Sequence, residues 1–598
     1  MPLTLVTGPA NAEKARVALD AQRVGAARGG LLVVPRPADV EAYRAELAAD
    51  GTVFGAGVVA FDRLLEAIAA RAGLRGRPVG ALARERIAAA AVARTRLRTL
   101  GEAAATPGFP RALLRLADEL EERRIEPGRW WAALRAWAAA EPGRGAYAED
   151  LGALYAAYRD ALAALGRRDG PLHAVAALDT LRVDPARWGG APVVLYGFDD
   201  LTPLELDAVE TLAVHVGADV LVTLAHEPGR VAFAARGETF AALRAIAREH
   251  VELPPRAEHY APAARAALHH LERSLFEDDP GRADPRDAVE LLEGGGERAE
   301  LELVAGRVRA LLDDGWAPED VAVVLRSPAE AAALAERVFT AAGVRVAVDR
   351  RVPAGHTALG RAVVGLVRAA LADGTAADLL AWLRAPGHHD VPALADRLEA
   401  RARREGVTTA RGARALWEAE HPTFPLEALD RLADAARAGP RALCDRLGAE
   451  ALRLLAAPFR GRAPVLDPAE ALDARVAGAL RRALDELAAL AAADPALWPP
   501  PAALAAALAA VEVQAADRRR RGVVAVTSPL ALRARRVRAL FLCRVQEGTF
   551  PAPPRPEPFL GDAERRALNA ASGLRLGLHE NGVDRERYLL YAALSRPT

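Results

Sequence analysis

The chain has 598 residues, enough for several domains that each bury a core of their own. Its 79 basic and 79 acidic residues cancel, so no overall field draws it to nucleic acid and any such surface must be local. Two cysteines, Cys444 and Cys543, are too few for a disulfide framework or a cysteine-rich cluster, and we expect buried, inert thiols. The sequence shows neither a secretory signal nor an apolar run of membrane length, so we expect a cytoplasmic protein without a membrane partner.

The first nineteen residues predict a strand, a tight turn and a helix. An apolar, β-branched run from Leu3 to Thr7 is followed by small residues from Gly8 to Ala12 and then by a helical pattern. This order is typical of a phosphate-binding loop, in which backbone N–H groups and a helix N-terminus hold phosphates.

The loop departs from the consensus G-x-x-x-x-G-K-[ST] in two places. Gly8 and Lys14 match, but Glu13 replaces the second glycine and Ala15 replaces the hydroxyl residue that holds Mg²⁺. A carboxylate at this position repels phosphate, so an ordinary βα unit explains the stretch as well. However, Lys14 is the only lysine among the 79 basic residues, and a compact charge on a flexible stem suits a phosphate pocket. We therefore expect some constraint at Lys14.

Beyond this unit, the apolar patterns predict two α/β regions, each interrupted by a long helical stretch. A linker rich in proline and aspartate at 276–287 separates the two halves. Strands are expected at 31–35, 57–61, 191–198, 218–225, 321–326, 523–529 and 537–545, a further β segment at 289–296, and helical stretches at about 74–181 and 357–517.

This plan resembles the superfamily 1 helicases of the UvrD type. The resemblance implies an α/β fold with two RecA-like P-loop cores, 1A and 2A, each carrying a largely helical insertion, 1B and 2B. It places core 1A at 1–73 and 186–275, insertion 1B at 74–185, core 2A at 286–356 and 518–598, and insertion 2B at 357–517.

Two segments carry the resemblance most clearly. The segment from Glu297 to Arg351 is similar to the family's fourth motif region, and the segment from Arg585 to Arg596 is similar to its sixth motif. By this resemblance Glu300 falls on a nucleotide-contacting glutamate, and Arg326 and Arg596 fall on phosphate-contacting arginines. Together with Gly8 and Lys14, these residues would form a vestigial nucleotide cleft.

The remaining motifs have lost the residues that hydrolysis needs. In the second motif, Tyr196 stands where the Mg²⁺-binding aspartate belongs and Gly197 where the water-orienting glutamate belongs. Residues 225–228 do not match the third motif, and residues 530–537 replace the fifth. We therefore expect no catalytic residue, no metal site and no required cofactor, with ATP binding weak at most.

Two aspartates follow the degraded second motif. Asp199 and Asp200 could form a replacement metal pair, but aspartate before a helical pattern is a common N-terminal signal. We expect them to cap the following helix.

The replacement sequences themselves resemble a narrower family, the AddB-type subunits of bacterial helicase–nuclease complexes. The resemblance rests on the strings at Gly197 to Glu205, Leu532 to Pro551 and Glu586 to Pro597. In that family this half is a motor-like scaffold, followed by a RecB-type nuclease domain and paired with an active helicase subunit. The sequence shows no nuclease signature and stops at Thr598 inside the sixth motif, so we expect a truncated product or fragment whose complete gene could carry an exonuclease.

Two groups of arginines are candidates for DNA contact. A solvated turn is the better explanation for the run from Arg518 to Arg521. For the second group, where the family's fifth motif approaches the strand, DNA contact and a solvated turn stay equally open because aromatic residues for stacking are few. This group consists of Arg533, Arg535, Arg536 and Arg538.

The leading hypothesis is an inactive-motor, DNA-binding subunit of a helicase–nuclease complex in double-strand break repair and recombination. Its expected partners are DNA, as a single strand or a duplex end, and a UvrD- or AddA-like helicase subunit. Two alternatives stay open: an active ATP-dependent DNA helicase or exonuclease subunit, and a protein-interaction scaffold without DNA contact.

Overall fold

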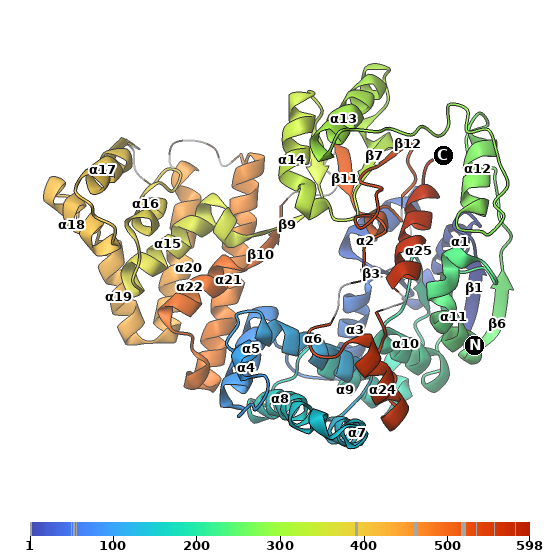
Figure 1. Ribbon diagram of the computed structural model, residues 1–598, viewed down its shortest axis with the longest axis horizontal. Coiled ribbons are helices and arrows are strands. Elements are labelled where there is room, and N and C mark those ends of the chain that lie inside the picture. Colours follow the sequence, from blue (N-terminus) through green and yellow to red (C-terminus); the bar gives the residue numbers. More distant parts are fainter. Residues whose placement is uncertain are drawn as a thin grey trace.

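Two separate parallel β-sheets organise the chain, and each is interrupted by a helical region (Figure 1). The computed structural model describes residues 3–49, 51, 54–55, 57–388, 391, 393–459, 461, 463, 465–515, 522–533, 535–554, 557–579 and 582–598. Within these ranges, no helix is both long enough and apolar enough to cross a bilayer.

The first sheet has six parallel strands in the order β3-β2-β4-β5-β1-β6. Alternate residues of each strand enter two different apolar clusters, so both faces are covered, as is usual for a parallel sheet. The strands are β1 (Leu3–Gly8), β2 (Leu31–Val34), β3 (Gly57–Ala60), β4 (Val193–Leu195), β5 (Val220–Ala225) and β6 (Ala247–Glu252).

Helices pack on both faces of this sheet. Helices α1 (Lys14–Gly25) and α2 (Pro37–Leu47) bury one stripe against one face. The opposite face is covered by α3 (Phe61–Arg71), α10 (Pro203–Glu210) and α11 (Gly237–Ile246), and α12 (Arg265–Ser274) follows β6.

The first helical region is inserted between β3 and β4. Its core contains large rings such as Trp130 and Tyr155, both fully buried. A later helix, α24 (Asp562–Ser572), packs into the same core. The inserted helices are α4 (Ala81–Arg94), α5 (Gly101–Ala104), α6 (Phe109–Glu122), α7 (Pro127–Ala139), α8 (Gly145–Ala164) and α9 (Gly170–Val183).

The second sheet has four parallel strands in the order β12-β7-β11-β8. Its core is mainly valine, which suits a buried strand. The strands are β7 (Val321–Val324), β8 (Val346–Val348), β11 (Val524–Thr527) and β12 (Ala539–Leu542), and the flanking helices are α13 (Glu297–Asp313), α14 (Pro328–Ala341), α23 (Pro529–Leu532) and α25 (Gly582–Leu594).

The second helical region leaves and rejoins this sheet through an antiparallel pair, β9 (Arg351–Pro353) and β10 (Glu512–Gln514). It extends away from both sheets as a separate helical body with one large apolar core (Figure 1). Its helices are α15 (Ala358–Leu371), α16 (Ala376–Leu383), α17 (Ala393–Arg404), α18 (Ala410–Glu420), α19 (Glu427–Ala438), α20 (Pro440–Ala456), α21 (Pro468–Ala493) and α22 (Pro501–Ala509).

The expected fold class is confirmed: the chain is α/β, with two parallel sheets consistent with RecA-like cores and two helical insertions. Two local expectations are wrong. Residues 289–296 form no strand, and β6, which lies at the edge of the first sheet, was not expected. The assignment of domain boundaries stays a prediction.

Candidate functional site

The turn between β1 and α1 keeps the backbone course of a tight strand–helix connection. A side chain at Gly8, where φ is 151°, would place its Cβ 2.7 Å from the carbonyl oxygen of Leu253, so only glycine fits. Glu13 adopts a left-handed conformation (φ 61°) at the position where the consensus has its second glycine. Its carboxylate turns outward and pairs with Arg256 at 2.7 Å and with Arg16 at 3.0 Å.

Lys14 is folded back onto its own turn. Only 7% of the residue is exposed, and Nζ donates hydrogen bonds to the carbonyl oxygens of Gly8, at 2.8 Å, and of Pro9. Burial, helped by the nearby charge of Arg596 and opposed by Glu272 and Glu227, lowers the pKa of Lys14 to about 7. The amine at the phosphate position is therefore bonded to the protein itself.

Helix α25 supplies a second internal partner for the turn. The backbone N–H of Ala10 donates to the Tyr591 hydroxyl at 2.9 Å, and that hydroxyl donates in turn to the carboxylate of Glu272. Burial, and then the charge of Glu272, raises the pKa of Tyr591 well above its usual value. The side-chain amide of Asn11 donates to the Tyr260 hydroxyl at 2.9 Å and to the Ser595 carbonyl at 3.2 Å.

Helix α25 is thus shared between the two sheets. One set of its residues, including Tyr588 and Tyr591, packs with Phe233 from the first half of the chain. Another residue of the helix, Ala593, packs with Val324 and other residues of the second sheet. Figure 1 shows α25 between the two sheets.

The structure brings together some of the residues predicted for the nucleotide cleft, but not all of them. Arg596 lies near enough to Lys14 to affect its pKa, and its guanidinium donates to the Arg533 carbonyl at 3.0 Å and to the Ser595 hydroxyl at 2.9 Å. Arg326 instead forms a two-pronged ion pair with Glu586 of α25, with N–O distances of 2.6–2.9 Å.

Glu300 acts within the second sheet. One of its carboxylate oxygens accepts the backbone N–H of Arg544 at 2.6 Å, just beyond β12, where Arg544 has a positive φ of 59°. Glu300 therefore stabilises this turn. At the degraded second motif, the Tyr196 ring packs edge-on against Tyr43, with 5.2 Å between ring centroids.

The two aspartates after β4 do not cap α10, so that expectation is wrong. Thr202 is the N-cap, and it forms a reciprocal capping box with Glu205. Asp199 instead accepts hydrogen bonds from Arg533 and from the Tyr588 hydroxyl, the latter at 2.6 Å. Because Asp199 follows β4 and Arg533 follows α23, this ion pair joins the two halves of the molecule.

Asp200 also has internal partners. It accepts the Thr239 hydroxyl and lies 3.6 Å from Arg236, whose guanidinium sits 3.8 Å above the Tyr588 ring. Among the described residues, no group of three or more His, Cys, Asp or Glu side chains is arranged to hold a metal ion.

The arginines predicted to bind DNA have very different surroundings. The side chain of Arg533 is only 11% exposed and is paired with Asp199, so it offers no free surface. Arg538 lies 3.8 Å above the Trp316 ring and 3.6 Å from Asp320. Arg536 is exposed and makes no ion pair within the described part of the chain, while residues 518–521 lie outside it.

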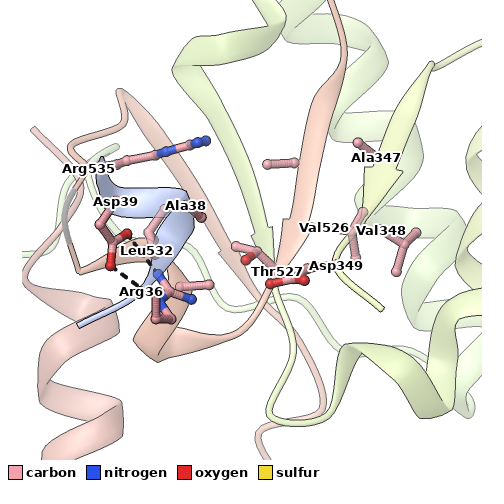
Figure 2. A pocket seen from close by; sticks show the side chains of 12 residues that line it. Arg36, Ala38, Asp39, Ala347, Val348, Asp349, Val526, Thr527, Leu532 and Arg535 are labelled. Atoms are coloured by element: carbon pink, nitrogen blue, oxygen red, sulfur yellow. Dashed lines mark hydrogen bonds and ion pairs between the residues drawn. The ribbon is translucent and has the colours of Figure 1, made fainter. Parts of the chain in front are cut away.

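Arg535 lines a narrow cavity of about 30 Å³ at the junction of the two halves (Figure 2). On one side, Figure 2 shows Arg36 and Asp39, which form an ion pair at 3.1 Å. On the other side lie the carboxyl ends of β8 and β11, including Asp349 and Thr527. A cavity of this size holds about one water molecule, so it does not accept a nucleotide base as it stands.

Three residues important to the turn were not identified from the sequence: Tyr591, Glu272 and Asn11. Their partners lie hundreds of positions away, so no local spacing marks them. The two cysteines are free and buried, as expected, and burial raises the pKa of each thiol to about 12.

Comparison with known proteins supports the resemblance seen in the motifs. No protein-family model matches the chain. The chain is 31% identical over 402 residues to the AddB-type subunit of the ATP-dependent helicase/deoxyribonuclease of Desulforudis audaxviator, and 28% identical over 399 residues to the corresponding protein of Pelotomaculum thermopropionicum. Each match covers 62% of this chain, and the chain spans about a third of the length of these relatives (33% and 34%). Over the part that it shares with them, the chain is an AddB-type sequence.

Proposed function

We propose that the chain is a non-hydrolysing, motor-like, DNA-binding subunit of a helicase–nuclease complex in double-strand break repair and recombination. Its relatives are named as subunits of an ATP-dependent helicase/deoxyribonuclease, which supports a role alongside a helicase partner and on DNA. The fold of two RecA-like cores supports a motor-like architecture, but fold alone does not carry motor activity.

The observation that carries the proposal is the internal bonding of the turn after β1. A phosphate held there needs the free Lys14 ammonium and free backbone N–H groups. Lys14 donates to the Gly8 and Pro9 carbonyls, and the Ala10 N–H donates to Tyr591. These residues do not fit Mg²⁺–ATP.

The losses at the other motif positions point the same way. Phosphoryl transfer needs a metal held by a hydroxyl and an aspartate, and a residue that orients the attacking water. Ala15, Tyr196 and Gly197 stand at these three positions. None of them offers the carboxylate that the reaction uses, and the Tyr196 ring packs against Tyr43.

In a nucleotide-driven motor of this fold, phosphates bridge the two cores and their release lets the cores move. Here protein groups bridge the two halves instead: Ala10 with Tyr591, Asn11 with the Ser595 carbonyl, and Asp199 with Arg533. We propose that these contacts hold the cores in one arrangement, so that the protein offers DNA a fixed surface that includes Arg536.

ATP hydrolysis by the isolated chain, measured with and without single-stranded DNA, tests the proposal. We expect no turnover in either case. DNA-stimulated turnover that is abolished in Lys14→Ala would contradict the proposal and support an active helicase.

A titration with DNA at several salt concentrations tests the second half of the proposal. We expect binding that weakens as salt rises, because cations that contact phosphates displace bound counterions. A chain that is folded, yet binds neither single-stranded nor duplex DNA at low salt, would favour the scaffold without DNA contact.

A further inference from the structure

Four exposed arginines gather on two loops that no part of the nucleotide site uses. Arg75 and Arg77 lie on the loop between α3 and α4, and Arg167 and Arg168 lie on the loop between α8 and α9. The loops are joined by a hydrogen bond of 2.9 Å from the Val79 N–H to the Arg168 carbonyl. The bond brings the four cations together at the seam between the first sheet and its helical insertion.

Neighbouring groups fix the course of both loops. On the first loop, Leu74 packs against the core of the first sheet and Val79 against the core of the insertion, so the short stretch between them bridges two cores. On the second loop, the Arg167 N–H donates to the Leu162 carbonyl at the end of α8, and the Asp169 side chain caps α9. The arginines therefore project from a defined backbone.

The four side chains are unpaired, unlike most arginines of this protein. Within the described residues, none of them lies in an ion pair, whereas exposed arginines such as Arg298 and Arg441 pair with acidic residues four positions away. Asp169 is fully buried and turns inward, where it accepts the Tyr158 hydroxyl and Arg84. Since the chain as a whole is neutral, this patch is a local concentration of positive charge.

A second group near the patch responds to this charge. Burial and the positive charge of Arg168 lower the pKa of His173 on α9. Glu486 of α21 approaches the far end of the first loop, at Gly80. The backbone N–H of Ala83 and the charge of Arg482 both favour its carboxylate form, so Glu486 already has partners of its own.

We propose that Arg75, Arg77, Arg167 and Arg168 form a docking surface for the phosphate backbone of duplex DNA. The guanidinium group matches phosphate in charge and geometry, and such contacts hold DNA irrespective of its sequence. Proteins that hold single strands add aromatic rings on which bases stack. Residues 74–79 and 166–169 contain no aromatic residue, which favours the duplex.

This inference rests on the proposed DNA-binding function and adds a surface to it. The test is a titration of the full chain with a blunt duplex and with a single strand, over a range of salt concentrations. The variant carries Arg75→Ala, Arg77→Ala, Arg167→Ala and Arg168→Ala. We expect its duplex affinity at low salt to fall by about tenfold or more, and the slope of log K against log salt to become shallower by about 2 to 4.

The matched control loses the same charge elsewhere. It carries Arg298→Ala, Arg309→Ala, Arg431→Ala and Arg441→Ala, four exposed arginines that pair with acidic residues on their own helices. We expect it to keep the slope of the unmodified chain. Replacing the four patch arginines with lysine should restore most of the duplex affinity, because phosphate contact depends mainly on charge.

The outcomes separate this inference from the function on which it rests. If the unmodified chain binds no DNA, both fail. If it binds duplex DNA and the patch variant binds with the same affinity and slope, only the docking surface is refuted. A patch variant that keeps its duplex affinity but loses binding to a helicase partner also refutes it, in favour of a protein-binding surface. Equal thermal unfolding midpoints for the two alanine variants exclude misfolding.

Discussion

The hydroxyl of Tyr591 on the last helix accepts a hydrogen bond of 2.9 Å from the backbone N–H of Ala10, in the turn after the first strand. The two residues lie 581 positions apart. In a phosphate-binding loop, backbone N–H groups of this turn point at the ligand. In this chain a protein hydroxyl, itself bonded to Glu272, takes that position.

The first prediction concerns this hydroxyl. Tyr591→Phe keeps the ring but leaves the Ala10 N–H and the buried Glu272 carboxylate without a partner, which should cost about 1–3 kcal/mol of stability. Thermal unfolding of the variant should show a lower midpoint. Glu272→Gln, which keeps an oxygen acceptor, is the control and should have the smaller effect. An unchanged midpoint in Tyr591→Phe would show that the contact does not stabilise the cores.

The second prediction is a pH dependence from Lys14. Its pKa is about 7 in the folded chain and 10.5 in the unfolded chain, so the unfolded chain binds more protons between these values. Stability contributed by Lys14 should therefore rise with pH across this window and be lowest below pH 7. Urea unfolding of the chain and of Lys14→Met at several pH values measures it.

The difference between the two proteins should shift in favour of lysine by about 1 kcal/mol per pH unit above pH 7. The two proteins share every other titrating group, so the contributions of those groups cancel in this comparison. A difference that does not vary with pH would mean that Lys14 stays exposed to water in solution.

The third prediction separates two neighbouring arginines. Arg533→Ala leaves the buried Asp199 carboxylate without its ion pair and should lower stability by about 3–5 kcal/mol without changing DNA affinity. Arg536→Ala should leave stability unchanged and reduce the salt dependence of DNA binding by about one phosphate contact. Thermal unfolding and DNA titration of both variants give the four values. The reverse pattern would refute the assignment of Arg536 to the DNA surface.

The fourth prediction concerns the contact between α24 and the first insertion. Arg565 is 2% exposed, and its guanidinium donates to both carboxylate oxygens of Glu119 at 2.9 Å. Arg565→Met should cost about 3–5 kcal/mol, because a partly buried carboxylate loses its partner. Arg441→Ala, at an exposed pair within one helix, is the control and should cost about 0.5 kcal/mol or less. Equal effects would mean that α24 is not anchored by this pair.

The sheets could be predicted because buried parallel strands are continuous apolar runs, as at residues 31–34. Strand β6 escaped prediction because it lies at the sheet edge and has the polar sequence AREHVE. Gly8 and Lys14 could be identified from their spacing to each other. Tyr591 could not, because its contact with the turn depends on the arrangement of two halves of the chain.

Charge provides the second limit. Arg533 and Arg536 belong to one basic stretch in the sequence, yet Arg533 is buried against Asp199 and Arg536 is exposed. The difference depends on carboxylates supplied by the first sheet, which local composition does not reveal. The same holds for Asp199, which follows a strand and precedes a helix but binds an arginine instead of capping.

Calorimetric titration of the isolated chain with Mg²⁺–ATP tests the central claim most directly. With Lys14 and the Ala10 N–H bonded within the protein, we expect no saturable heat of binding, and the same result for Lys14→Ala. Binding at micromolar concentration that disappears in Lys14→Ala would contradict the account, because it would show that nucleotide displaces these internal contacts.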